Sequence, residues 1–276
     1  MNIETLIEQS KEIVNKAVVD YDPYAVLVAV SGGDDSLTAY HLTKYLGIPI
    51  DGILHINTQT GIEETTIFVR NLADKENVSY FEGDAGTAYD EYILRKGFFG
   101  RGLKAHSYAY HILKKTVITK VLATIRQRKR NRKILIINGA RITESDNRAK
   151  NFAGRIYRED NSNVWVNIIH YWTKSHCLEF LSGCSGICRN PVSIQLCRSG
   201  ECMCGTMQSI QSRHEAAALY PDWGKRMDER ERQVLERFPW GWGQNIPSSF
   251  ALEQKGQLRL FDYDLQPLCS SCLNEE

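Results

Sequence analysis

One short polar stretch, residues 31–36, constrains the fold of this chain more than any other feature. It reads Ser-Gly-Gly-Asp-Asp-Ser and follows an apolar run of strand character, Ala25 to Val30. A helix-compatible run, Leu37 to Leu46, comes directly after it. A strand, a tight glycine turn and a helix N-terminus in this order direct backbone N–H groups and two hydroxyls at one spot, where the helix dipole also favours negative charge. The stretch therefore predicts a phosphate-binding loop.

Two common phosphate-binding loops do not match the spacing of residues 31–36. A Walker A loop requires a lysine followed by Ser or Thr after its last glycine, and no lysine stands here. The dinucleotide-binding fingerprint requires a third glycine at a fixed spacing, which is also missing. The pattern that remains, Ser-Gly-Gly-x-Asp-Ser, resembles the loop of the PP-loop ATP pyrophosphatases, which cleave ATP between its α- and β-phosphates. The alternative is an ordinary strand–turn–helix connection with Ser or Asp caps.

The wider pattern predicts an α/β fold with a doubly wound parallel sheet, because strand-like and helix-like runs alternate. Strands are expected at 25–30, 50–56, 78–82, 134–138 and 164–169, and helices at 2–18, 36–46, 62–76, 88–96, 106–129 and 208–237. In such sheets, ligands bind at the carboxyl ends of the strands. We expect one domain over residues 1–173, with a cysteine-rich, helical region over 174–276 packed on it.

The composition, 42% hydrophobic and 24% charged, is that of a globular chain, and no apolar run approaches the roughly 20 residues that span a bilayer. The first 19 residues have a helical period broken by charges, unlike a signal peptide, so a cytoplasmic location is expected. The net charge of +1 gives no bulk attraction to nucleic acid. Basic residues nevertheless crowd positions 126–133, as a solvated helix end or as a surface for phosphate backbones.

Two further segments follow expected strand ends and resemble the phosphoadenosine phosphosulfate (PAPS) reductase branch of the same family. Residues 56–65 are similar to its Asp-Thr-Gly…Glu-Thr segment, with Asn57 in place of the usual acid. Residues 139–148 are similar to its Gly-x-Arg-x-x-Glu-Ser-x-x-Arg segment. Residues 100–114, with Gly100, Gly102, Lys104, His106 and Lys114, resemble the segment on the sulfur-acceptor side. In this chain we expect His106 either to transfer a proton or to form a structural hydrogen bond.

The resemblance implies an adenine nucleotide α-hydrolase-like fold and an ATP site. The residues expected to bind ATP are Ala29, Val30, Ser31, Gly32, Gly33, Asp34, Asp35, Ser36, Asn57, Thr58, Gly139 and Arg141. Those expected to take part in catalysis are Asp35, Ser36, Arg141 and Arg148. Arginines suit this role because they hold phosphates bidentately and stabilise departing pyrophosphate. Asp34 and Asp35 either hold Mg²⁺ or cap the helix.

All eight cysteines lie after residue 176. A reducing compartment argues against disulfides, so clustered thiols suggest a metal. A four-thiolate site for a [4Fe–4S] cluster or for zinc is expected from Cys202, Cys204, Cys269 and Cys272, with Cys188 and Cys197 as substitute ligands. The alternative is free thiols without metal.

Within the family the chain looks most like the DndC and SspD proteins of DNA phosphorothioation, a restriction–modification chemistry. PAPS reductases carry Glu-Cys-Gly-x-His near the C-terminus, whereas this chain ends in Cys-Ser-Ser-Cys, residues 269–272. The resemblance implies that ATP and Mg²⁺ adenylate a DNA backbone phosphate, that pyrophosphate leaves, and that sulfur from a cysteine desulfurase partner is inserted. Three alternatives stay open: a tRNA-thiolation adenylase, a sulfonucleotide reductase, and a nucleotide-binding redox sensor.

Overall fold

The computed structural model describes residues 2–127, 131–144, 155–160 and 162–250. Within this part of the chain, six strands form one sheet in the order β3-β2-β1-β4-β6-β5. The strands are β1 (Ala25–Ala29), β2 (Gly52–Asn57), β3 (Tyr80–Asp84), β4 (Ile134–Asn138), β5 (Tyr157–Asp160) and β6 (Asn163–Asn167). All neighbours are parallel except β5, which runs antiparallel to β6 at the edge. The predicted α/β fold is confirmed.

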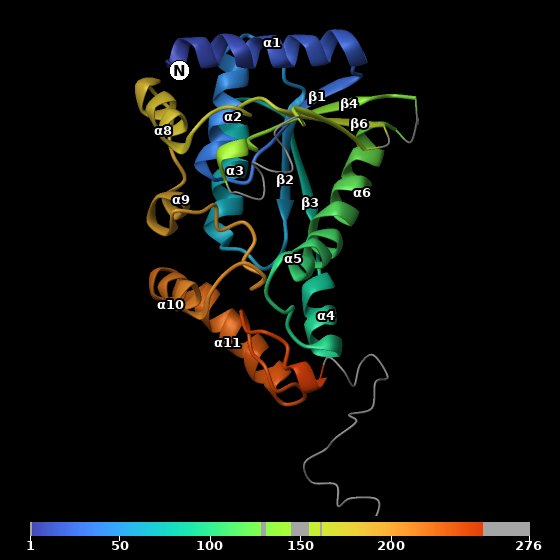
Figure 1. Ribbon diagram of the computed structural model, residues 1–276, viewed down its shortest axis with the longest axis vertical. Helices are drawn as coiled ribbons and strands as arrows, with labels where there is room; N and C mark the ends of the chain where they lie inside the picture. The colour runs from blue at the N-terminus through green and yellow to red at the C-terminus, as the bar shows by residue number, and fades with distance from the viewer. Residues whose placement is uncertain (1, 128–130, 145–154, 161, 251–276) are drawn as a thin grey trace, which may run out of the picture.

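Helices cover both faces of the sheet (Figure 1). They are α1 (Ile3–Tyr21), α2 (Asp34–Tyr45), α3 (Glu63–Lys75), α4 (Ala88–Lys96), α5 (Leu103–Tyr110), α6 (Thr116–Ile125), α8 (Lys174–Gly183), α9 (Pro191–Leu196), α10 (Ile210–Leu219) and α11 (Pro221–Leu235). A π-helical turn, η1 (His111–Lys115), joins α5 to α6, and a 3₁₀ turn, η2 (Ile142–Glu144), follows β4. No helix in the described ranges is long and apolar enough to cross a membrane.

The three layers follow from the two-residue period of the strands. In β1, Val26 and Val28 pack with α1, α2, α3 and α8, whereas Leu27 packs with α6 on the other face. In β4, Leu135 and Ile137 join the first face and Ile136 joins the second. Because both faces are buried, these strands read as unbroken apolar runs in the sequence, as is typical of parallel sheets.

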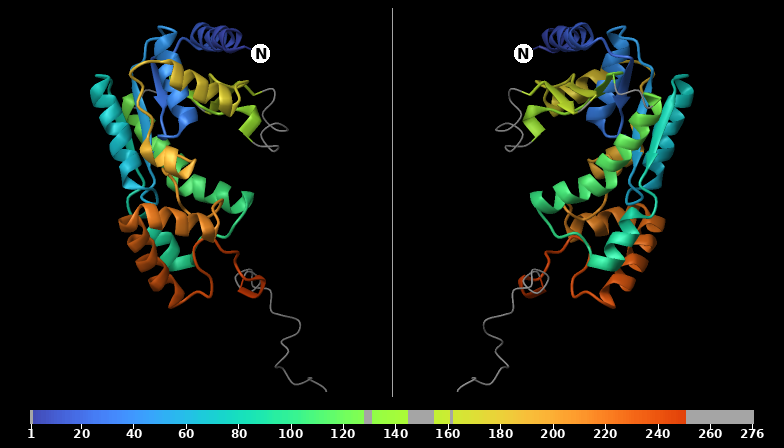
Figure 2. Two further views of the ribbon diagram at one scale, coloured as in Figure 1. Left: turned by 90° about the vertical axis from the view of Figure 1, so that its left-hand side faces the viewer. Right: turned by 90° about the vertical axis from the view of Figure 1, so that its right-hand side faces the viewer.

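A third apolar cluster lies beyond the carboxyl ends of the strands, where α4, α10 and α11 meet residues 238–242. Figures 1 and 2 show α10 and α11 at the opposite end of the molecule from α1. Each of its three buried tryptophans donates its indole N–H to a backbone carbonyl: Trp223 to Thr60, Trp240 to Phe98 and Trp242 to Met203, all at 2.9 Å. These bonds tie the aromatic cluster to the loop after β2, to the turn after α4 and to the segment after α9.

The structure differs from the sequence-based elements in several places. The helix expected over 208–237 is two helices, because Pro221 cannot continue α10 and instead opens α11. The helix expected over 106–129 begins at Leu103 and contains the π-turn. The short strand β5 and the helices α8 and α9 were not predicted. The N-terminal residues of α8 and α9 are nevertheless typical of helix starts. Thr173 and His176 form a capping box before α8, and Asn190 precedes a proline at the start of α9.

The anchoring of α1 on the sheet yields the first prediction. Ser10 is buried, accepts a hydrogen bond from the Trp172 indole at 3.1 Å, and donates to the Ile168 carbonyl at 2.8 Å. Ser10→Ala leaves both partners unpaired, and we expect the free energy of unfolding to fall by about 2 kcal/mol in denaturant titrations. The exposed Ser107→Ala is the matched control, with an expected change within about 0.5 kcal/mol. Equal effects of the two variants would contradict the anchoring role.

Candidate functional site

The loop 31–36 lies at the point where the strand order of the sheet reverses. Strand β1 sits between β2 and β4, and the chain leaves β1 for β2 and β3 on one side before returning to β4 on the other. Open α/β sheets bind ligands at the carboxyl ends of the strands at this position. Gly32 adopts a φ of +78°, and a Cβ there would lie 2.7 Å from the Thr65 methyl and 2.9 Å from the Asn190 amide nitrogen. Only glycine suits this turn.

The two serines of the loop brace it from within. The Ser31 N–H and hydroxyl donate to Ser36 Oγ at 3.1 and 3.2 Å, and the Ser36 hydroxyl donates to the Gly33 carbonyl at 2.8 Å. The N-cap of α2 is Gly33, which offers no side-chain oxygen to the first N–H groups of the helix. An uncapped helix N-terminus with a positive dipole end is suited to an anion.

Asp34 opens α2 at the centre of an ion network. Arg189 donates to both of its carboxylate oxygens, at 2.9 and 3.0 Å, and Lys174 Nζ lies 3.0 Å away. The Ser193 hydroxyl adds a bond at 3.2 Å. Burial would raise the pKa of Asp34, which is 5% exposed, but the hydrogen bonds from Arg189 and Lys174 outweigh it and hold the pKa below its ordinary value. Asp34 is therefore an anchor for two cations.

Asp35 pairs with Arg141, the arginine predicted to contact ATP. Arg141 Nη2 donates to Asp35 at 2.9 Å, and Lys174 reaches the other carboxylate oxygen at 3.2 Å. Arg141 is only 7% exposed, and its Nε has no hydrogen-bond partner among the described residues. A buried guanidinium N–H without a partner costs free energy. Three cations thus face two carboxylates beside the helix N-terminus.

The structure places the other predicted ATP-site residues as follows. Gly139 comes directly after β4 and packs closely against α2, since a Cβ at this position would lie 2.3 Å from the Asp35 carbonyl oxygen. This close approach brings Arg141 to the loop. The Ala29–Val30 pair ends β1. Asn57 and Thr58 lie at the end of the neighbouring β2, where their side chains bond to Glu82 and to the Glu201 carbonyl. Arg148 lies outside the described residues.

Sequence reasoning missed Lys174, Arg189 and Asn190 as parts of this site. Asn190 is fully buried and its amide donates to the Gly32 carbonyl at 3.1 Å and to Thr65 at 3.2 Å, so it fixes the glycine turn. The Arg-Asn-Pro sequence at 189–191 carried a signal in its N-cap and proline, but its distance of about 150 residues from the loop hid the contact.

Residues 199–206 run from this loop along the carboxyl ends of the strands. Ser199 lies against Gly33, and its carbonyl accepts from Thr65 at 2.7 Å. Gly61 is so close to this run that a Cβ would lie 2.3 Å from the Glu201 carbonyl. The Glu201 side chain forms a buried ion pair with Lys114, which comes from the π-turn, at 2.7 Å. The Glu201 carboxylate outweighs the effect of burial and keeps the pKa of Lys114 raised, so this lysine stays charged.

Cys202 and Cys204 stand on the same run, each beside a threonine hydroxyl. Thr60 Oγ1 lies 3.8 Å from Cys202 Sγ, and Thr206 Oγ1 lies 3.4 Å from Cys204 Sγ. A hydrogen bond between the two thiols lowers the pKa of Cys204 and raises that of Cys202, and Lys114 favours the thiolate. Thr206 also contacts His106 Nδ1 at 3.3 Å.

The four-thiolate site remains a prediction. Among the described residues, no three His, Cys, Asp or Glu side chains gather as a metal site would require. Cys188 and Cys197 are exposed. Cys269 and Cys272 lie outside the described residues, so the proposed partners of Cys202 and Cys204 are not placed.

Comparison with known proteins identifies the fold's relatives. A model of the phosphoadenosine phosphosulfate reductase domain matches residues 25–191. Solved structures that resemble the chain include PAPS reductase from Candida auris in a phosphate complex (13% identity, TM-score 0.47, covering 69% of this chain and 88% of that one). They also include NH3-dependent NAD synthetase from Campylobacter jejuni subsp. jejuni (14%, 0.48, 86% and 95%) and FMN adenylyltransferase from Candida glabrata with ATP (14%, 0.44, 65% and 54%). No curated protein matches.

The ion network yields a pH-dependent prediction. At neutral pH we expect Asp34→Asn to lower the free energy of unfolding by about 2 kcal/mol, because Arg189 and Lys174 lose their shared carboxylate. The folded-state pKa of Asp34 is lowered, so this contribution is complete above the ordinary carboxyl range and is lost as the pH falls through the lowered pKa. Denaturant titrations from neutral to acid pH measure it.

The matched control is Asp222→Asn, whose side chain is 98% exposed and pairs with Lys225 at 3.2 Å. Its expected effect is below about 0.5 kcal/mol at every pH. A constant difference between wild type and Asp34→Asn across the acid range would show that the carboxylate charge of Asp34 contributes nothing.

Proposed function

Because the chain belongs to the phosphoadenosine phosphosulfate reductase domain family, we propose that it binds ATP on residues 31–36 and cleaves it between the α- and β-phosphates. The observation that carries the proposal is the uncapped N-terminus of α2 beside the partly unpartnered, buried guanidinium of Arg141. Together they form a site for a polyanion at the switch point of the sheet.

In the proposed reaction, the protein's main contribution is to hold the phosphates and to stabilise the leaving group. The N–H groups at the start of α2 hold the departing phosphates without reorganising, because the Ser31 and Ser36 hydroxyls already fix the loop. An acceptor oxygen attacks the α-phosphorus, the bond to the bridging oxygen breaks, and pyrophosphate leaves with the electron pair. Arg141 and Lys174 lie where they can neutralise the growing charge, in exchange for part of their bonding to Asp35.

Asp34 is poorly suited to coordinate Mg²⁺, the ion that accompanies ATP in most such reactions. Both of its oxygens accept from Arg189, and Lys174 and Ser193 take further lone pairs. Asp35, whose side chain is 23% exposed, is engaged by Arg141 and Lys174. Both aspartates are thus engaged in ion pairs, and neither caps the N-terminus of α2, so no step of the proposal runs through a metal bound to them.

For the acceptor, we propose a DNA backbone phosphate. The terminal persulfide sulfur of a cysteine desulfurase attacks the adenylated phosphorus, AMP leaves with the electron pair, and a second thiol reduces the S–S bond to release the phosphorothioate. This proposal rests on the resemblance of residues 31–36 and 139–148 to the DNA phosphorothioation proteins. Arg189 and Asn190 lie at the same site, because Arg189 pairs with Asp34 and Asn190 donates to the Gly32 carbonyl. The thiols of Cys202 and Cys204, and a cluster completed by Cys269 and Cys272, take no part in the ATP step proposed here.

Product analysis of ATP turnover with Mg²⁺ tests the proposal. We expect AMP and pyrophosphate, with a rate raised by DNA more than by tRNA. Arg141→Ala should slow the reaction by about 10² to 10³-fold, because it removes a charged donor aimed at the leaving group. Arg141→Lys should restore only part of the rate, since lysine lacks the planar, bidentate guanidinium.

The control for Arg141→Ala is Arg95→Ala, an exposed arginine on α4, which should turn over ATP at the wild-type rate. ADP and phosphate as products would refute the proposed bond cleavage. Sulfite released from PAPS with thioredoxin, without AMP formation from ATP, would assign the chain to sulfonucleotide reduction instead.

A further inference from the structure

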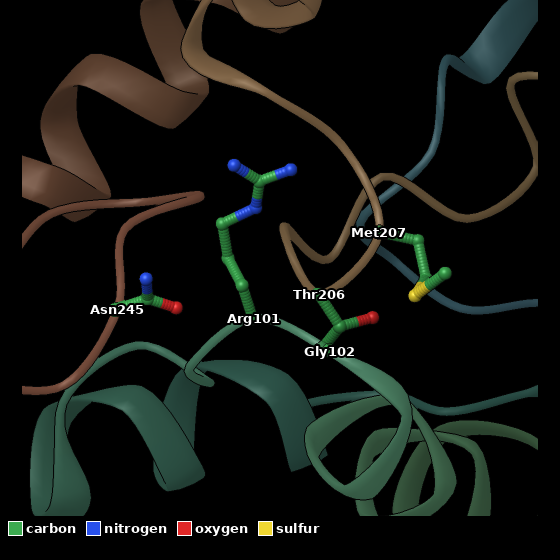
Figure 3. Close-up of a pocket in the computed structure, with 5 residues that line it drawn as sticks. All are labelled: Arg101, Gly102, Thr206, Met207 and Asn245. Atoms are coloured by element: carbon green, nitrogen blue, oxygen red, sulfur yellow. The ribbon is translucent and has the colours of Figure 1, made fainter.

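A cavity of about 280 Å³ lies at the far end of the 199–206 run, lined by Arg101, Gly102, Thr206, Met207 and Asn245. None of these residues belongs to the ATP site described above. Figure 3 shows the Arg101 side chain extending into the space between the segments that carry Thr206 and Asn245. The walls therefore come from three separate parts of the chain.

The lining of this cavity carries positive charge and no negative charge. Arg101 is the only ionisable side chain in its lining, and no acid faces it. The exposed Arg101 guanidinium makes no hydrogen bond or ion pair with any residue that the structure describes. Asn245 adds an amide to the lining, whereas the buried Thr206 hydroxyl is engaged by Cys204 and His106. An unpartnered guanidinium with a neutral amide beside it is complementary to a small oxyanion.

A larger cavity, of about 570 Å³, lacks this character, although more charged residues line it. It lies between α4 and α11 and is lined by Asp90 and Glu229 as well as by three cations. All three cations are engaged: Arg230 pairs with Asp90, Lys225 pairs with Asp222 at 3.2 Å, and Arg226 donates to the Gly61 carbonyl at 3.0 Å. Of these two cavities, the Arg101 cavity alone holds a cation without a partner among the described residues.

The walls of the Arg101 cavity are fixed by close backbone contacts. The Gly102 N–H donates to the Thr206 carbonyl at 3.0 Å. At Gly205, which has a φ of +92°, a Cβ would lie 2.9 Å from the Gly243 nitrogen. Thr206 itself is 1% exposed and holds both Cys204 and His106 through its hydroxyl. A rigid, preformed site loses little entropy on binding.

The 199–206 run sets the distance between this cavity and the ATP loop. It starts against Gly33 and ends in the cavity wall, so the two sites are separated by at most seven residues of chain, about 23 Å. A nucleic-acid strand rises about 3.4 Å per nucleotide, so it reaches from one site to the other within about seven nucleotides. The separation of the two sites is thus within the reach of one acceptor strand.

We propose that the Arg101 cavity is a second anion-binding subsite, which takes one tetrahedral oxyanion of the acceptor: a phosphodiester that flanks the phosphate to be modified. This inference rests on the proposed function for the identity of the acceptor. The same chemistry would also hold a free oxyanion such as phosphate or thiosulfate, and the experiment separates the two sources.

The test uses the full chain and three probes: fluorescein-labelled DNA, inorganic phosphate and thiosulfate. Fluorescence anisotropy at several salt concentrations measures DNA binding, and calorimetry measures the two small anions and ATP. We expect Arg101→Ala to weaken DNA binding at least fivefold and to reduce the slope of log K against log salt by about 0.7 to 0.9, the loss of one phosphate contact. ATP binding should be unchanged, and Arg101→Lys should recover most of the DNA affinity.

Arg95→Ala is the matched control, because this arginine is also exposed but lines neither cavity. Loss of phosphate or thiosulfate binding in Arg101→Ala, with DNA binding intact, would support the anion subsite and identify a free oxyanion as its ligand. No difference between Arg101→Ala and wild type with any probe, or an equal loss in Arg95→Ala, would overturn it. Failure of ATP cleavage to give AMP would refute the proposed function and leave this binding result standing.

Discussion

The ion network at the start of α2 is the interaction on which the rest of the site depends. Two adjacent aspartates in a first helical turn bind three cations that the chain supplies from three distant places, Arg141 after β4, Lys174 at α8 and Arg189 before α9. Acidic residues there also complement the helix dipole. The network fixes the loop and leaves one guanidinium N–H of Arg141 without a partner among the described residues, beside the helix N-terminus at which we propose that an anion binds.

The region after β6 completes that site in a way that the sheet alone could not. Asn190 fixes the glycine turn, and the run from Ser199 to Thr206 covers the loops that follow β1 and β2. Glycines at positions 32, 61 and 139 allow these backbones to approach where a Cβ would collide. The aromatic cluster around Trp223 and Trp242 then holds the run from the far side. The proposed phosphate-binding loop and the fold of this region therefore depend on shared contacts.

The sequence predicted what local patterns encode. The loop 31–36 and the buried strands could be read because glycine turns and apolar runs are local signals, and the family follows from them. The sequence did not predict a role for Lys174 or Arg189, because each contacts Asp34 from a distant part of the chain, about 140 and 155 residues away. Nor could it separate the capping and metal-binding roles of Asp34, since both need an acid in the same turn. The edge strand β5 was missed because its Tyr-Arg-Glu-Asp sequence shows no alternation of apolar residues.

The central claim is that ATP lies with its phosphates on residues 31–36 under Arg141. The most direct test is a crystal structure of the chain with an ATP analogue whose bridging α–β oxygen is replaced by methylene. The account predicts that the analogue's phosphates accept hydrogen bonds from the N–H groups at the start of α2 and from Arg141 Nε, with Arg189 still on Asp34. An analogue seated elsewhere, with Arg141 Nε still unpartnered, would contradict it.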